Sequence, residues 1–84
     1  MIGIELKRAR LRSQLSQEEL AHRANMDRSH ISDLECGKKS PTIDTVFRLC
    51  DVMQVSPSNL VARVERQLQK EKLEKKRSKP KQSN

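Results

Sequence analysis

The sequence has few of the residues from which sheets, disulfide networks and aromatic cores are built. Its 84 residues include one aromatic side chain, Phe47, with two glycines, three prolines and two cysteines. Because turn-forming residues are scarce and no alternating apolar pattern is present, an all-α fold is expected. No run of about 18 apolar residues is present, which argues against a transmembrane helix. The length suits one small domain.

The cysteines and the N-terminal residues bear on the compartment. Cys36 and Cys50 do not have CxxC spacing, and two reduced thiols are favoured over a disulfide or a metal site. The charged residue Glu5 comes before any apolar stretch, so no signal peptide is predicted. We therefore expect a cytoplasmic protein that holds no metal and no cofactor.

The formal net charge of +7 is unevenly distributed. Residues 1–64 contain 10 lysines and arginines against 8 acidic residues, whereas residues 65–84 contain 8 against 3. The last eight residues, RSKPKQSN, include no apolar side chain. We therefore expect a folded domain over residues 1–69 and a basic, disordered tail over residues 70–84. Nucleic acid or an acidic membrane surface can attract such a tail.

Helix signals in the first half predict three short helices. The first runs from about Ile4 to Arg12. Ser16 and Glu19 have the spacing of a capping box at the start of the second, with Leu15 and Leu20 placed for a hydrophobic staple. After a turn at residues 25–27, the third helix is expected to begin with Asp27 as its cap and to end at about Cys36, before Gly37.

Two further helices are predicted after a loop at residues 38–41. Thr42 can cap the fourth helix, and Ser56-Pro57 opens the fifth, which runs to about Lys76. The apolar face expected for the fourth consists of Ile43, Val46, Phe47, Leu49, Cys50 and Met53. The fifth has apolar residues at Leu60, Val61, Val64 and Leu68.

The second and third predicted helices form the most informative segment. Small or apolar residues at Leu20, Ala21, Ala24, Ile31 and Leu34 bury one face of each helix across a tight turn at Asn25. The opposite face of the third helix consists of Arg28, Ser29, Ser32 and Asp33. An apolar back and a polar front suit insertion into a groove, so the pattern predicts a helix-turn-helix that reads DNA.

Residues 3–64 resemble the lambda-repressor-like helix-turn-helix domains of the Xre type, which include small phage repressors and restriction–modification controller proteins. The resemblance rests on Leu6, Arg10, the SQEELA run at residues 16–21, the IS-x-LE-x-G run at residues 31–37, and Pro41. It implies a compact five-helix bundle that binds operator DNA, usually as a two-fold dimer. The chain departs from the family pattern at Asn25, where glycine is usual, at Leu11, on the outer face of the first helix, and at Cys36.

The resemblance also implies roles for individual residues. Gln17 would bind a DNA phosphate at a helix N-terminus, which favours anions; a solvated glutamine is the alternative. Arg28, Ser29, Ser32 and Asp33 are the candidates for reading bases. Arg28 can bind a guanine or a phosphate, whereas Asp33 can accept from a cytosine or pair within the protein.

Further phosphate contacts are expected from His30, Lys38, Lys39, Ser40 and Thr42. The family pairs the residues matching Arg10 and Glu35. This pair is either buried, where loss of one partner costs ~3–5 kcal/mol, or exposed and worth less than ~1 kcal/mol.

These observations predict a sequence-specific transcriptional regulator that reads the major groove of double-stranded DNA with residues 28–36. A homodimer is expected, with Val61, Val64 and Leu68 as contact candidates, and with no membrane or small-molecule partner. When bound to DNA it would be associated with the nucleoid. The alternative is a protein-interaction module such as an antitoxin, whose tail orders on a partner. An enzyme is not expected, because His22, His30 and Cys36 lack an orienting third group.

Overall fold

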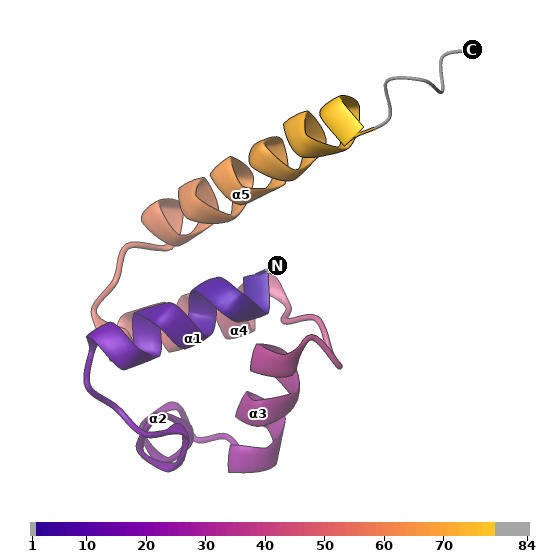
Figure 1. Ribbon diagram of the computed structural model, residues 1–84. Helices are drawn as coiled ribbons and strands as arrows, with labels where there is room; N and C mark the ends of the chain where they lie inside the picture. Colours follow the sequence, from indigo (N-terminus) through magenta and orange to yellow (C-terminus); the bar gives the residue numbers. More distant parts are fainter. Residues whose placement is uncertain (1, 79–84) are drawn as a thin grey trace.

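The computed structural model describes residues 2–78, with side chains for residues 2–71, and this part of the chain forms five helices and no strand (Figure 1). The helices are α1 (Ile2–Arg12), α2 (Gln17–Ala24), α3 (Arg28–Cys36), α4 (Ile43–Met53) and α5 (Pro57–Ser78). The prediction of an all-α, five-helix fold is therefore confirmed. Helix α1 begins two residues earlier than expected, at Ile2.

Helix α1 lies at the centre of the arrangement, with α3 on one side and α5 on the other (Figure 1). Helix α2 packs against α3 and α4, and α5 also contacts α4. The core takes side chains from all five helices because each contributes residues at three-to-four spacing. Its largest fully buried members are Leu6, Leu20, Ile31, Leu34, Leu49, Cys50 and Leu60.

Most of the predicted helix ends are present. The Ser16 Oγ accepts from the Glu19 backbone N–H at 3.0 Å, and the Glu19 carboxylate accepts from the Ser16 N–H at 2.9 Å, which completes the capping box. The Thr42 hydroxyl accepts from the Thr45 N–H at 3.2 Å. Asp27 occupies the cap position of α3, but its side chain makes no capping hydrogen bond, so its predicted role is wrong in this respect. Helix α3 begins there by backbone geometry alone.

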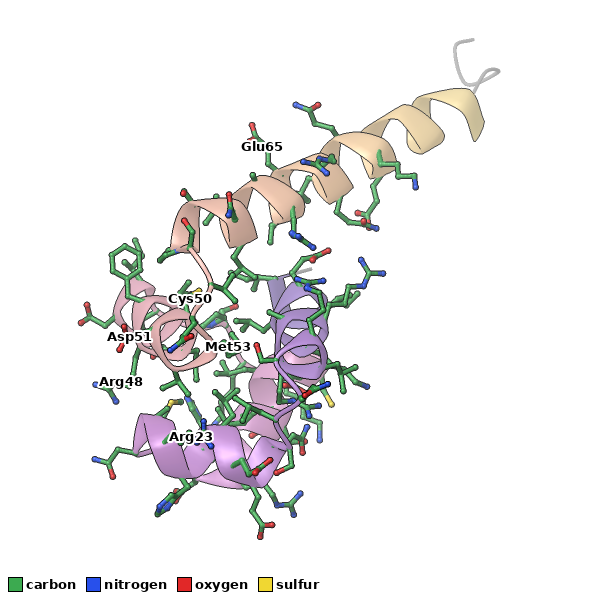
Figure 2. All side chains as sticks on the ribbon, turned by 90° about the vertical axis from the view of Figure 1, so that its left-hand side faces the viewer. Arg23, Arg48, Cys50, Asp51, Met53 and Glu65 are labelled. Atoms are coloured by element: carbon green, nitrogen blue, oxygen red, sulfur yellow. The ribbon has the colours of Figure 1, made fainter. Side chains whose placement is uncertain are left out.

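The predicted apolar face of α4 is only partly buried. Cys50 and Met53 point into the body of the protein, whereas Arg48 lies on the outside (Figure 2). Ile43 is 73% exposed and Phe47 57% exposed, so these two members of the predicted apolar face do not face the core. Residues four apart share a helix face, and this pair lies beside the stripe that faces the core. The buried stripe is Val46, Leu49, Cys50 and Met53.

Helix α5 continues without interruption across residues 69 and 70 and ends at Ser78, which confirms the predicted helix to about Lys76 within two residues. Residues 70–78 are therefore helical, and the disorder expected for this part of the tail was wrong. The segment after Arg66 consists mainly of glutamine, lysine, glutamate and leucine, which favour helix even without a packed partner. The disorder expected for residues 79–84 lies outside the described residues. None of the helices within residues 2–78 has both the length and the apolar character needed to cross a membrane.

Candidate nucleic-acid interface

Helices α2 and α3 are joined by a turn that fixes the angle between them. Asn25 ends α2 in the left-handed conformation, at φ 58°, which asparagine tolerates better than most residues. The Met26 N–H donates to the Ala21 carbonyl at 2.8 Å and closes the turn. Ala24 and Ile31 are buried where the two helices meet. The hydrogen-bonded turn and the side chains buried beside it therefore set the relative placement of the two helices in a helix-turn-helix.

The outer face of α3 holds the four predicted base-reading residues. Arg28 and Ser29 are exposed, and Ser32 and Asp33 are partly exposed. Arg28 lies one helical turn before Ser32, and Ser29 lies one turn before Asp33. The four side chains therefore form a continuous polar surface. The opposite side of α3 is fixed by the burial of Ile31 and Leu34.

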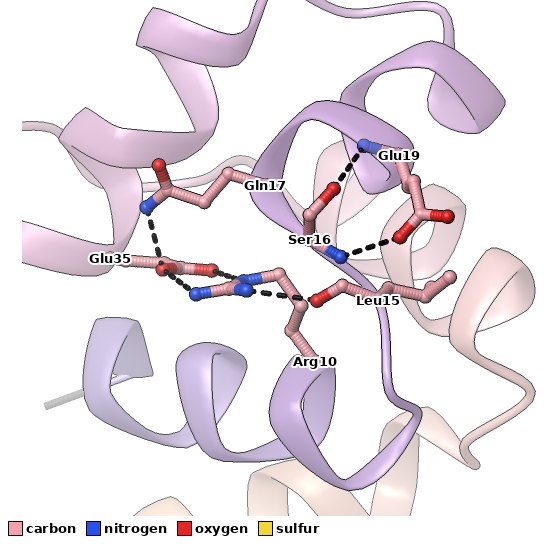
Figure 3. Close-up of polar contacts among 6 residues, drawn as sticks. All are labelled: Arg10, Leu15, Ser16, Gln17, Glu19 and Glu35. Atoms are coloured by element: carbon pink, nitrogen blue, oxygen red, sulfur yellow. Dashed lines mark hydrogen bonds and ion pairs between the residues drawn. The ribbon is translucent and has the colours of Figure 1, made fainter.

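An ion pair between α1 and α3 holds α3 from behind (Figure 3). The Arg10 Nε donates to the Glu35 Oε2 at 2.7 Å, and the Arg10 Nη2 donates to the Glu35 Oε1 at 3.1 Å. The Arg10 Nη1 donates to the Leu15 carbonyl at 2.9 Å. Arg10 is 7% and Glu35 8% exposed, so the buried form of the pair is the one present. One guanidinium thus joins α1, α3 and the segment before α2.

Gln17 joins the same network from the first turn of α2. Its Nε2 donates to the Glu35 Oε1 at 3.0 Å (Figure 3). An amide nitrogen carries two hydrogens, so this bond leaves the second hydrogen of Gln17 for another acceptor. The sequence did not predict that Gln17 contacts Glu35, because the two residues are 18 positions apart.

A shallow hollow lies beside this network, where α1 meets the starts of α2 and α3. Arg10, Ser16, Gln17, Glu18 and Arg28 line it. The backbone N–H groups in the first turn of α2 have no carbonyl partner within the helix, and their dipoles favour an anion. Arg28 adds positive charge, whereas Glu18 opposes it. The hollow has the donors needed to bind one phosphate group.

The loop between α3 and α4 holds most of the other residues that were predicted to contact phosphates. Lys38, Lys39, Ser40 and Thr42 are exposed, and His30 is partly exposed near the start of α3. The Lys39 Nζ lies 3.9 Å from the Asp33 Oδ2, a loose pair on the surface. Asp33 therefore has a lysine partner within the protein, which was one of the two roles predicted for it.

Gly3 is a residue whose role the sequence analysis missed. A Cβ added to Gly3 would lie 2.3 Å from the Leu34 carbonyl oxygen and 2.9 Å from the Glu35 carbonyl oxygen. Only glycine allows the start of α1 to approach the end of α3 this closely. No signal for this role was present in the sequence, because the first helix was predicted to begin after Gly3 and nothing in the sequence identified its neighbour.

The two cysteines have different environments. Cys36 is exposed at the end of α3, and Cys50 is buried, where desolvation raises the pKa of its thiol. Both are free thiols. Within the described residues, no three histidine, cysteine, aspartate or glutamate side chains gather as metal ligands would.

Comparison with known proteins agrees with this geometry. A family model described as helix-turn-helix matches residues 6–60. The chain is 33% identical over 61 residues to an uncharacterized HTH-type transcriptional regulator, y4dJ, of Sinorhizobium fredii, which covers 73% of this chain and 79% of the relative. It is 31% identical over 62 residues to the control protein C.BamHI of Bacillus amyloliquefaciens, which covers 73% of this chain and 76% of that protein.

A solved structure is similar as well. It contains SinR, a master regulator for biofilm formation, in complex with DNA. The TM-score is 0.68 at 31% sequence identity, over 73% of this chain and 98% of that one.

Proposed function

This chain belongs to the lambda-repressor-like helix-turn-helix family and is a DNA-binding transcriptional regulator, and we propose that it reads operator DNA as a homodimer. The observation that carries the proposal is the polar outer face of α3, which is accessible while its back is fixed by the core and by the Arg10–Glu35 pair. A rigid helix of this kind can enter the major groove without reorganising.

Base readout is assigned to the outer face of α3. Arg28 has the reach to bind the N7 and O6 atoms of a guanine. Ser29 and Ser32 are short and let the helix approach closely. Asp33 can accept from a cytosine amino group if Lys39 turns from it to a phosphate, because the two are separated by 3.9 Å in the free protein.

Phosphate contacts on the two sides of α3 would hold it in register. On one side, the Glu35 carboxylate orients the Gln17 amide, whose second N–H can donate to a phosphate in the hollow at the start of α2. On the other side, Lys38, Lys39, Ser40 and Thr42 can bind the opposite strand, and His30, within the first turn of α3, can add a further phosphate contact. Such contacts supply affinity and position the helix but do not read sequence.

The dimer surface is assigned to the outer sides of α4 and α5. Ile43, Phe47 and Val61 are more than half exposed, and Leu68 is 45% exposed. Phe47 and Pro57 line one hollow, which shows that the outer face of α4 adjoins the start of α5. Val61 lies one turn after Pro57. We call Ile43, Phe47, Val61 and Leu68 the α4–α5 apolar surface, with Val64, which is partly buried, at its edge.

The first test is a selection of bound sites from random DNA duplexes, followed by affinity measurements on the selected site. We expect an inverted repeat, because a two-fold dimer reads two half-sites. Arg28→Ala should weaken binding by about 1–3 kcal/mol and relax the preference at one position of each half-site. Arg23→Ala, which removes an exposed charge from α2, is the matched control. Absence of any enriched sequence would refute specific readout.

The second test measures the oligomeric state by sedimentation. Phe47→Ala and Val61→Ala together should shift the protein from dimer to monomer, because exposed apolar side chains at the centre of an interface contribute most of its affinity. Leu11→Ala removes an exposed apolar side chain from α1 and should leave the dimer intact. A monomeric wild-type protein at the concentrations that bind the operator would refute the dimer.

A further inference from the structure

A basic groove runs between α1 and the first half of α5. Glu5, Arg8, Arg63, Arg66, Gln67 and Lys70 line it, and we call it the α1–α5 groove. Glu5 is only 3% exposed, and its carboxylate accepts from the Arg8 Nη1 at 3.0 Å. Among the described side chains, none forms an ion pair with Arg63 or Arg66. With four cationic side chains and one carboxylate among its lining residues, the groove carries an excess of positive charge.

The groove is separate from the surfaces already assigned. Helix α1 lies between α5 and α3, so the groove is on the side of α1 away from the base-reading face (Figure 1). On α5, successive residues are 100° apart, which puts Arg63 and Lys70 on the opposite face from Val61 and Leu68. A protein that bound DNA through α3 and dimerised through the α4–α5 apolar surface would therefore leave the groove open.

Two exposed apolar side chains lie on α1 within one helical turn of Arg8, which lines the groove. Ile4 is 49% and Leu11 56% exposed, and they lie one turn before and one turn after Arg8. Leu11 is also the residue that departs from the family pattern on the outer face of the first helix. The neighbouring turns of α1 therefore present two apolar side chains with one cation between them.

We propose that the α1–α5 groove is a docking surface for an acidic amphipathic segment of a partner protein. Arg63, Arg66 and Lys70 repeat at three-to-four spacing over about 10 Å, which matches carboxylates on one face of a helix. The apolar face of the same segment would cover Ile4 and Leu11. The phosphate backbone of duplex DNA offers negative charge but no continuous apolar face to cover these two side chains. The groove belongs to the fold, so this inference does not depend on the proposed reading of operator DNA.

The test uses the full chain and a fluorescent synthetic helix built from glutamate and leucine, with leucines at three-to-four spacing. Binding is measured by anisotropy at moderate salt. Arg63→Gln with Arg66→Gln should weaken binding about tenfold. The matched control is Arg23→Gln with Arg48→Gln, which removes the same charge from α2 and α4, away from α5 (Figure 2), and should change affinity less than twofold.

Further variants test the apolar contact and the class of partner. Leu11→Ala should weaken peptide binding, whereas Leu11→Met, which keeps an apolar side chain of similar volume at the same position, should not. Operator affinity should be the same in both double variants. Equal loss of peptide affinity in the two double variants would show attraction by net charge alone and overturn the proposal. A selective loss of DNA affinity in the groove variant would also overturn it, by making the groove a nucleic-acid contact.

Discussion

The buried Arg10–Glu35 pair gives the sharpest prediction for this fold. Glu35→Gln keeps the size of the side chain but removes its charge, while Arg10 stays 7% exposed beneath the start of α2. Two of the three Arg10 hydrogen bonds that the structure shows go to this carboxylate, at 2.7 and 3.1 Å. A glutamine has one carbonyl oxygen and can accept at only one of those two positions.

The expected loss of stability follows from the buried charge that remains. Removing one member of a buried pair typically costs about 3–5 kcal/mol, because the remaining ion is desolvated without compensation. In this protein the Leu15 carbonyl still accepts from Arg10 at 2.9 Å, so we expect the lower end, about 3 kcal/mol. Since the stability of a small domain is about 5–15 kcal/mol in total, this change removes a large share of it.

Urea unfolding of the wild type and of the Glu35→Gln variant measures this loss. Asp33→Asn is the control, because it breaks the loose surface pair with Lys39 and should cost less than about 1 kcal/mol. Arg10→Met combined with Glu35→Leu should recover most of the stability, since well-packed apolar side chains often replace a buried pair at little cost. If Glu35→Gln costs no more than Asp33→Asn, the pair is hydrated and the reasoning is wrong.

The remaining predictions concern backbone geometry and one cap. Gly3→Ala should destabilise the protein by about 1–3 kcal/mol in urea unfolding, because the new Cβ meets the Leu34 carbonyl oxygen at 2.3 Å; a neutral result would mean that α1 can move away freely. Gln54→Gly should stabilise it by up to about 1 kcal/mol, because Gln54 has a φ of 58°, whereas Gln69→Gly within α5 should destabilise. The pKa of Glu19 is lowered mainly by a hydrogen bond from the Ser16 backbone and, to a smaller extent, by one from the Ser16 side chain. The stability that the Glu19 carboxylate adds as a cap is therefore fully present above the ordinary glutamate pKa. It is lost as the pH falls through the lowered pKa. The melting temperature of Glu19→Gln should therefore approach that of the wild type in acid, and a gap that is constant with pH would contradict this.

Local chemistry made the helix boundaries predictable. The Ser16 and Glu19 spacing predicted a capping box that the structure contains, and Asn25 and Gly37 end α2 and α3 in the left-handed conformation. These features depend on neighbours within a few residues, so the sequence carries the whole signal. Burial was harder to predict because it depends on which helix packs against which face. Phe47 has the residue type of a core side chain, yet it is exposed because the core lies against the adjacent stripe of α4.

The sequence by itself determined the five helices, the polar face of α3 and the family to which the chain belongs. Only the tertiary structure decided how these parts act together. The Gln17–Glu35 hydrogen bond and the approach of Gly3 to the end of α3 join residues distant in the chain. The α1–α5 groove likewise exists because α5 continues as a helix and rests on α1. The spacing of apolar residues predicts where each single helix lies in the sequence. The relative placement of the helices depends instead on how their side chains pack against one another.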